Sequence, residues 1–239
     1  MKGDKILVQD LHYRAADAIV PALVDAVRAS ATRFVIAVSG ESGSGKSETA
    51  QAIQERLAAR GIHGVILAQD DYFVYPPKTN DAARRRDPAW LGPAVEVKLD
   101  LLNEHCGAAI RGADFLIKPF VDYAADRIEE ERIGLDGIKA VIVEGTYTAL
   151  LKNVHMRIFI ARSRRETLEH RRKRNRGAEA FDPFIEGILE TEHKIIAGHR
   201  LLADFVITPQ YEVVRIQGIE DPSASSRPPS SQASPGSHG

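Results

Sequence analysis

One eight-residue stretch, Gly40 to Ser47, constrains the fold of this chain more than any other feature. It reads Gly-Glu-Ser-Gly-Ser-Gly-Lys-Ser and fits the phosphate-binding pattern G-x-x-x-x-G-K-[ST] at every fixed position. The apolar run before it, 34–39, is rich in β-branched residues and predicts a buried strand. The segment after it, 46–60, has apolar residues at helical spacing. A strand, a glycine loop and a helix in this order favour a nucleotide-binding loop over a chance Gly/Ser-rich turn.

The residue types of this loop suit a polyphosphate. Glycines at 40, 43 and 45 let the backbone approach a ligand without a Cβ atom in the way. Successive N–H groups can then form an anion-binding nest at a helix N-terminus. Lys46 would bring a positive charge to the β- and γ-phosphates, and the Ser47 hydroxyl can ligate Mg²⁺. We therefore predict ATP binding by Gly40, Glu41, Ser42, Gly43, Ser44, Gly45, Lys46, Ser47 and Glu48, with Lys46 also catalytic.

The composition is that of an ordinary globular protein. The 239 residues are 44% hydrophobic and 27% charged, enough for one sizeable α/β domain and short for two. A net charge of −1 gives no electrostatic case for nucleic acid or a membrane surface as the main partner. The single cysteine, Cys106, allows no intrachain disulfide, and no apolar run approaches the length of a membrane span. Because the N-terminus also lacks a signal-peptide pattern, we expect a cytoplasmic protein.

The rest of the chain alternates between helical and strand-like patterns. Pro21 favours a later start for the first helix, because proline suits a first turn. The charged segment 127–132 predicts a surface turn or a short hairpin. We predict helices at 15–29, around 100–106 and at 183–201, and strands at 64–69, 115–121, 141–143, 156–160 and, last in the chain, 204–208. This alternation indicates a doubly wound, mostly parallel α/β sheet.

Carboxylates follow two of the predicted strands. Asp70 and Asp71 end the strand at 64–69, and ligands of open α/β sheets bind at this edge. Because neighbouring side chains diverge, we expect only one of the two aspartates to face the site. We favour Asp70 as the base that accepts the proton of an acceptor hydroxyl. The alternative is that Asp70 caps a helix or turn. Glu144 closes the strand at 141–143 and suits Mg²⁺ or its water shell, the alternative being a buried Glu paired with a base. The predicted metal site comprises Ser47, Glu144 and Asp70.

Three further segments have unusual compositions. Residues 74–94 contain several Pro, Asn, Asp and Gly residues and predict a long irregular substrate loop. Trp90 lies in it and suits either a stacking wall for a ring-shaped acceptor or a hydrophobic anchor. The arginine-rich segment 164–176 predicts a lid, at about 164–180, whose guanidinium groups match phosphate geometry. A Ser/Pro-rich tail, 221–239, predicts disorder outside a single domain of residues 1–220.

In their order along the chain, these motifs resemble those of the uridine kinase and phosphoribulokinase-like P-loop kinases. The resemblance covers roughly residues 33–208. The stretch 67–73 is similar to the segment that supplies that family's catalytic aspartate, which falls on Asp70. Segments similar to its acceptor-binding segment, its acidic strand end and its last strand occur at 119–122, 143–145 and 203–207. Arg171, Arg174 and Arg176 fall where its lid arginines lie, and we assign them to ATP binding.

The resemblance implies transfer of the γ-phosphoryl group of ATP, with Mg²⁺, to a hydroxyl group, by a homodimer or homotetramer. The acceptor stays open between a uridine- or cytidine-like nucleoside and a sugar-like molecule. Val121 and Asp126 stand where uridine kinases usually have an aromatic residue and a histidine. We assign acceptor binding to Tyr72, Phe73, Trp90, Asp100, Asp122 and Arg127.

The rival class is a P-loop ATPase or a regulatory nucleotide switch. The sequence has neither the [NT]-K-x-D motif of GTPases nor the L-S-G-G-Q motif of transporter ATPases. A kinase would turn over little ATP without its acceptor, whereas a switch would hydrolyse its nucleotide slowly whatever small molecule is added.

Overall fold

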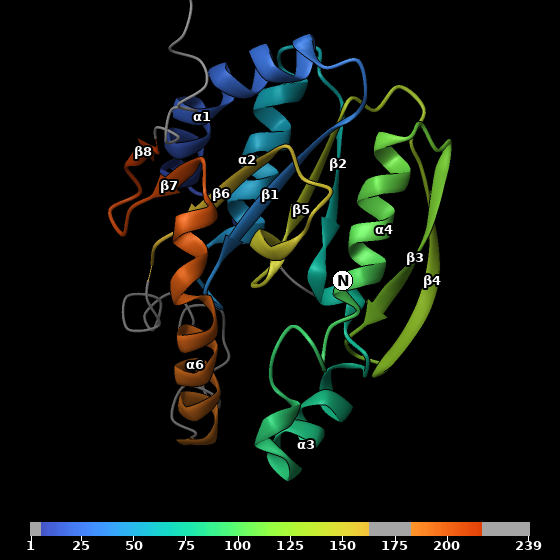
Figure 1. Cartoon of the computed structure of the whole chain (residues 1–239), viewed down its shortest axis with the longest axis vertical. Helices are drawn as coiled ribbons and strands as arrows, with labels where there is room; N and C mark the ends of the chain where they lie inside the picture. Colours follow the sequence, from blue (N-terminus) through green and yellow to red (C-terminus); the bar gives the residue numbers. More distant parts are fainter. Residues whose placement is uncertain (1–5, 163–182, 217–239) are drawn as a thin grey trace, which may run out of the picture.

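The core of the molecule is a six-stranded sheet with the strand order β2-β5-β1-β6-β7-β8 (Figure 1). A computed structural model describes residues 6–162 and 183–216. Neighbouring strands pair in parallel except for β8, which is antiparallel to β7. The six strands are β1 (Phe34–Gly40), β2 (Gly64–Ala68), β5 (Ala140–Glu144), β6 (Met156–Ile160), β7 (Phe205–Ile207) and β8 (Val213–Arg215). The mostly parallel sheet expected from the sequence is confirmed.

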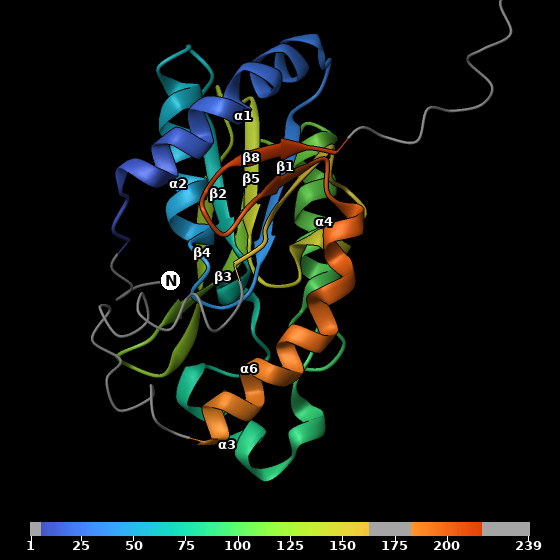
Figure 2. The same ribbon diagram turned by 90° about the vertical axis from the view of Figure 1, so that its left-hand side faces the viewer.

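Helices cover both faces of this sheet (Figure 2). Alternate residues of β1 point to opposite faces: Ile36 packs in one hydrophobic cluster and Ala37 in the other. The first cluster includes α1 (Asp10–Ala29) and α2 (Lys46–Ala58), and the second includes α4 (Leu99–Ile110). Because both faces are covered, all seven residues of β1 are buried, which explains their nearly continuous apolar sequence.

A second, two-stranded sheet lies beside α4. It consists of β3 (Phe115–Asp122) and β4 (Arg127–Gly134), paired antiparallel. Of the two alternatives for the charged segment at 127–132, the hairpin is therefore correct. β4 is longer than expected because its mostly exposed face carries the charges, while Ile133 packs against the core.

Several short elements follow the strands at the edge of the sheet where β1, β2 and β5 end. The short 3-10 helix η1 (Gln69–Tyr72) follows β2 directly, and η3 (Thr148–Leu150) comes shortly after β5. The helix α6 (Pro183–Ile196) continues into η5 (Ala197–Leu202), so the helix expected at 183–201 changes to 3-10 geometry near its end.

Three sequence expectations were wrong. The first helix begins at Asp10, with Pro21 inside it, because the buried face continues on both sides of the proline. The segment 74–94 is not irregular: it contains α3 (Pro77–Arg86) and η2 (Pro88–Trp90). Proline at the start of each of these elements is compatible with helix, and Ala and Arg favour it. The strand at 204–208 is not the last, since β8 follows it.

Some expectations lie outside the described residues. These are the whole of the arginine-rich lid, at about 164–180, and the whole of the Ser/Pro-rich tail, 221–239. Within the described part of the chain, no helix is both long enough and apolar enough to cross a membrane.

Candidate active site

The glycine loop follows β1 and leads into α2, as the sequence predicted. Gly40 has a φ of 154°, and a Cβ atom there would lie 2.8 Å from the Ile160 carbonyl oxygen, so the tight turn needs glycine. The Lys46 ammonium donates to the Glu41 carbonyl oxygen at 2.9 Å, and the Ser44 N–H donates to the same oxygen at 3.0 Å. These two hydrogen bonds close the loop on itself.

The loop has the features that a phosphate group requires. The Ser44 hydroxyl and the Thr49 hydroxyl are buried and have no hydrogen-bond partner among the described residues. A buried polar atom without a partner is costly, and phosphate oxygens at the helix N-terminus would satisfy such donors. The residues therefore fit a nucleotide polyphosphate, with the positive charge of Lys46 at the loop.

Ser47 and Glu144 meet at the carboxyl ends of the central strands. The Ser47 hydroxyl donates to Glu144 Oε1 at 3.2 Å. Burial, together with the nearby Asp70 carboxylate, raises the pKa of Glu144 to about 7, although Lys46 and Ser47 act in the opposite direction. A buried carboxylate next to a second carboxylate and a hydroxyl is a donor set that suits Mg²⁺, which accepts oxygen ligands and keeps several waters. The predicted site of Ser47, Glu144 and Asp70 thus fits a divalent cation.

The two adjacent aspartates point in different directions. Asp71 is buried; its carboxylate accepts the Lys118 ammonium at 2.6 Å and the Val121 N–H at 3.0 Å. Asp70 is exposed and lines a cavity of the described chain. Asp71 thus ties η1, which follows β2, to the β3–β4 hairpin, while Asp70 faces the cavity.

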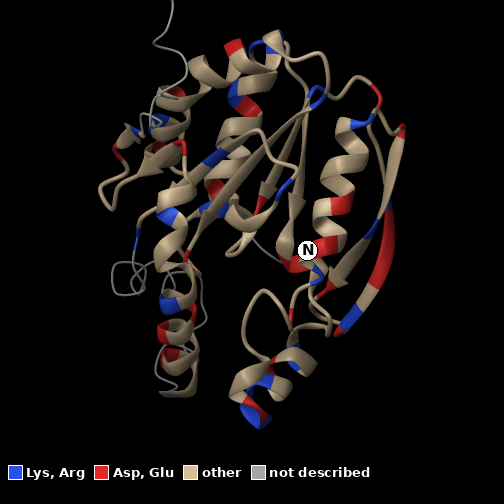
Figure 3. Ribbon diagram, viewed as in Figure 1, with Lys and Arg blue, Asp and Glu red and all other residues tan. Residues whose placement is uncertain are grey.

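This cavity has a volume of about 480 Å³ and is lined by residues of the glycine loop, α3 and α6. Ser42 of the loop and Asp70 both line it. Figure 3 shows acidic and basic positions on both α3 and α6. The polar and charged lining of the cavity includes Ser42, Gln69, Asp70, Lys78, Asn80, Asp81, Arg84, Arg85, Glu96, Thr146, Tyr147 and Glu192. The apolar lining includes Phe73, Ile188 and Leu189.

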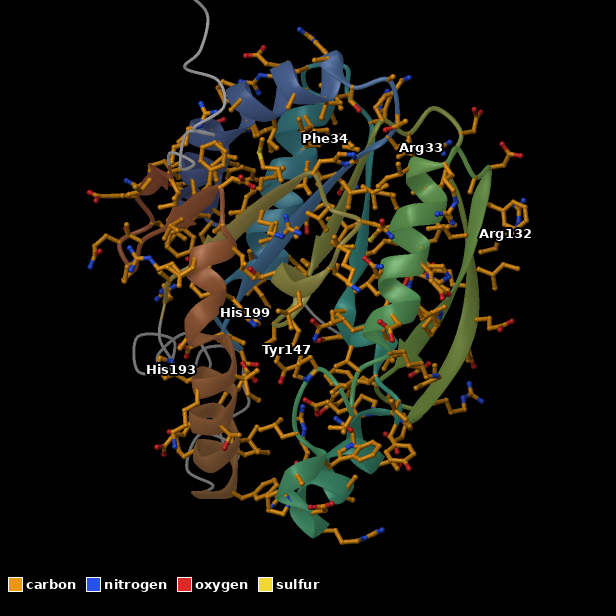
Figure 4. All side chains as sticks on the ribbon, viewed as in Figure 1. Arg33, Phe34, Arg132, Tyr147, His193 and His199 are labelled. Atoms are coloured by element: carbon orange, nitrogen blue, oxygen red, sulfur yellow. The ribbon has the colours of Figure 1, made fainter. Side chains whose placement is uncertain are left out.

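Glu96 is the centre of a polar network in the wall of the cavity. Its buried carboxylate accepts hydrogen bonds from the Arg84 Nε atom at 2.7 Å and from the Asn80 amide at 3.3 Å. It also accepts from the Gly92 N–H at 3.1 Å and from the Tyr147 hydroxyl at 3.3 Å. The network fixes α3 against the segment after β5, where Tyr147 is labelled in Figure 4.

Sequence reasoning missed both Glu96 and Glu192. Glu192, on α6, accepts the Ser42 N–H at 2.8 Å and the Ser42 hydroxyl at 3.0 Å, and burial raises the pKa of its carboxyl group. The adjacent His193, labelled in Figure 4, contacts Glu41 at 2.6 Å between Nδ1 and Oε1. No local motif marks these residues: Glu96 lies in a turn, and the helical spacing around Glu192 is the same as that of a solvated face.

Of the residues assigned to acceptor binding, Phe73 lines the cavity and the others do not. Tyr72 is fully buried, with its hydroxyl 2.8 Å from His105 Nδ1. Trp90 stacks on Tyr75 and donates to the Asn80 side chain, so it is an anchor and not a wall. Asp100 is exposed in the first turn of α4. Asp122 and Arg127 lie at the β3–β4 hairpin, where the Asp122 carboxylate accepts the Ala125 N–H and Arg127 forms an ion pair with Glu129. These five assignments followed order along the chain and not side-chain direction, and they stay predictions.

The remaining nucleotide assignments divide into two groups. Glu41 and Glu48 are buried beside the loop, in keeping with a role in its structure. Arg171, Arg174 and Arg176 lie outside the described residues.

Comparisons with known proteins identify relatives of the chain. No protein-family model matches it. The bifunctional alpha-galactosidase/sucrose kinase AgaSK of Mediterraneibacter gnavus is 31% identical over 186 residues, which are 73% of this chain and 20% of that protein. The chain therefore spans about a fifth of the length of this relative.

Solved structures share the fold over most of the chain. A D-glycerate 3-kinase from Cryptococcus neoformans has a TM-score of 0.58 at 12% identity, over 87% of this chain and 99% of that one. A candidate fructose transport system kinase from a Silicibacter species has a TM-score of 0.55 at 18% identity, over 77% and 93%. A candidate uridine kinase from Bacillus stearothermophilus has a TM-score of 0.50 at 20% identity, over 80% and 97%. The chain has the fold of the P-loop kinases, as expected from its resemblance to the uridine kinase and phosphoribulokinase-like group.

Proposed function

We propose that this protein is an ATP-dependent kinase that transfers the γ-phosphoryl group to a hydroxyl of a neutral, sugar-like molecule. The observation that carries the proposal is the cavity shared by Ser42 and Asp70. One wall belongs to the loop that would hold ATP, and another presents a carboxylate to an acceptor. Phosphoryl transfer needs both reactants in line, so a common cavity is the required arrangement.

Each residue has a defined part in this reaction. The glycine loop and Lys46 bind the β- and γ-phosphates. Ser47 and Glu144 would hold Mg²⁺, which would supply charge neutralisation at the phosphates. Asp70 orients the acceptor hydroxyl and accepts its proton as the oxygen attacks. The new bond joins that oxygen to the γ-phosphorus, and ADP leaves.

The charges of the cavity favour a neutral acceptor. Arg84 pairs with Glu96, and Arg85 pairs with Asp81, so neither guanidinium group is free for an anionic ligand. The lining contains four carboxylates, those of Asp70, Asp81, Glu96 and Glu192, against the three basic side chains of Lys78, Arg84 and Arg85. A phosphorylated or carboxylated acceptor would meet net repulsion here, whereas a polyhydroxylated molecule can donate to carboxylates and amides.

The sucrose kinase named in the relative supports a carbohydrate as the acceptor class. The second candidate is a uridine- or cytidine-like nucleoside, which is also neutral. Phe73 and Tyr123 at the cavity favour this alternative, since an aromatic side chain can stack on a base. Aromatic faces also pack against sugar rings, so these two residues do not separate the candidates.

The test is ADP release from MgATP with a panel of acceptors. The panel contains sucrose, glucose, fructose, uridine and cytidine as neutral acceptors, and ribulose 5-phosphate and glycerate as anionic acceptors. We expect low release with MgATP alone and strong stimulation by a neutral sugar. Stimulation by uridine or cytidine alone would favour the nucleoside candidate. Stimulation by an anionic acceptor alone would contradict the charge argument, and slow release that no acceptor changes would contradict kinase activity.

A further inference from the structure

The turn between β7 and β8 contains a residue in an unfavourable backbone conformation. The Thr208 N–H donates to the Glu212 carbonyl at 2.8 Å, and the Tyr211 N–H donates to the Thr208 carbonyl at 2.9 Å. The hairpin is thus closed by a short turn in which Tyr211 has a φ of +64°. Glycine or asparagine is preferred at such a left-handed position, and a bulky residue costs about 1–2 kcal/mol there. A strained tyrosine persists when contacts elsewhere hold it in place.

Those contacts lie on the glycine loop. Tyr211 is buried, with 6% of its surface exposed, and its hydroxyl donates to the Ser44 carbonyl oxygen at 2.7 Å. The His12 ring, on α1, contacts the tyrosine ring edge-on, with 5.1 Å between the ring centroids. A Cβ atom at Gly45 would lie 2.1 Å from the Tyr211 hydroxyl. The tyrosine therefore packs directly against the backbone of the loop. A side chain at position 45 would collide with the hydroxyl.

The hydrogen bond to Ser44 fixes the orientation of one peptide unit. The carbonyl of Ser44 and the N–H of Gly45 belong to the same planar trans peptide, so they point in opposite directions. With the carbonyl held by Tyr211, the Gly45 N–H is directed away from the tyrosine. The amides of a phosphate-binding loop must point together at the ligand before it arrives, because reorientation on binding would cost free energy.

We propose that Tyr211 is a positioning residue for the nucleotide: its hydroxyl holds the Ser44–Gly45 peptide so that the Gly45 N–H faces the phosphates. The inference rests on the proposed function only in that the loop binds a nucleotide. It assigns a role to a residue of the β7–β8 turn, which lies more than 160 positions after the loop in sequence (Ser44 and Tyr211 are 167 apart).

The test compares Tyr211→Phe with Tyr13→Phe. Both remove one hydroxyl and keep the ring, but the Tyr13 hydroxyl bonds the exposed Glu55 carboxylate between α1 and α2. For each variant we would measure the MgADP dissociation constant, the MgADP-induced rise in melting temperature, and KM for MgATP with an acceptor that the wild type uses. We expect Tyr211→Phe to weaken MgADP binding and raise KM for MgATP by about 3- to 10-fold, which is the range for one lost hydrogen bond. KM for the acceptor should stay within about twofold, because the cavity wall is unchanged.

The result that would overturn the inference is MgADP binding by Tyr211→Phe that matches Tyr13→Phe. Equal loss of affinity for nucleotide and acceptor would also overturn it, since that is the effect of a general loss of structure. If Tyr211→Phe does not fold, Tyr211→Gly provides the second variant, which relieves the backbone strain and removes both the hydroxyl and the buried ring. Weak MgADP binding by folded Tyr211→Gly with an unchanged KM for the acceptor supports the inference, and unchanged MgADP binding overturns it. MgADP binding needs no acceptor, so this result is separate from failure of the proposed kinase activity.

Discussion

Asp70 and Asp71 are neighbours in the sequence, but their carboxylates have opposite surroundings. Asp71 is enclosed and bonded to Lys118 and the Val121 N–H, whereas Asp70 faces the cavity. A buried ion pair that loses one partner leaves an uncompensated charge, which is strongly destabilising. An exposed carboxylate at a ligand site contributes much less to folding.

We therefore expect Asp71→Asn to lower the free energy of unfolding by about 3 kcal/mol, because the buried Lys118 ammonium loses its closest partner. Asp70→Asn, the matched variant one residue away, should change it by less than about 0.5 kcal/mol. Urea denaturation of both variants checks this expectation. Similar losses from the two substitutions would show that the aspartates do not have separate roles.

At the residue scale, the sequence identified the groups whose chemistry is encoded locally. The glycine loop, Ser47 and Glu144 lie next to strand ends that the apolar pattern marks, so their positions could be predicted. The contacts of Tyr72 and Trp90 could not be predicted, because the direction of a side chain depends on what packs beside it. Glu192 and Tyr211 act on the loop from distant parts of the chain, and no local spacing reveals that contact.

Among the elements, the connection between α4 and the strands depends on Arg33, just before β1 (Figure 4). Its guanidinium group donates to the carbonyl oxygens of Ala109, Ala113, Leu135 and Ile138 at 2.8 to 3.2 Å. These carbonyls lie at the end of α4, at the segment before β3 and between β4 and β5. One guanidinium group thus donates to carbonyl oxygens in three parts of the chain. The planar arrangement of its N–H groups suits arginine to this role.

We expect Arg33→Met to lower the free energy of unfolding by about 2–4 kcal/mol, because four partly buried carbonyl oxygens each lose a hydrogen bond from the guanidinium group. Arg28→Met is the control, since Arg28 makes one exposed hydrogen bond, to the Arg60 carbonyl at 3.3 Å. Thermal and urea unfolding of the two variants would decide the matter. A loss no larger for Arg33 than for Arg28 would contradict the assigned role.

The same scale shows why α3 was missed. Pro76, Pro77, Asn80 and Asp81 suggested an irregular loop, but both prolines precede or begin the helix and so do not break it. Tertiary contacts hold α3 in place. Asn80 and Arg84 donate hydrogen bonds to Glu96, and Trp90 donates one to Asn80. Local propensity cannot register such contacts, because Glu96 lies outside the helix.

For the whole molecule, the alternation of strands and helices was enough to predict a doubly wound parallel sheet. It also placed the ligand site at the carboxyl ends of the strands, where the cavity lies. The cavity itself could not be predicted, because its walls come from the glycine loop, η1, α3 and α6. Its charge pairs, on which the proposal of a neutral acceptor rests, form only when these elements are packed together.

The central claim is that Asp70 directs the γ-phosphoryl group of ATP to a hydroxyl of an acceptor in this cavity. The most direct measurement follows γ-labelled ATP with wild type and Asp70→Asn, at a saturating concentration of the best neutral acceptor, and separates phosphorylated acceptor from free phosphate. The account predicts that wild type places the label on the acceptor, and that Asp70→Asn lowers this transfer at least about 100-fold, the scale of general base catalysis, while it still binds MgADP. Label found only in free phosphate, or an Asp70→Asn protein with undiminished transfer, would contradict it.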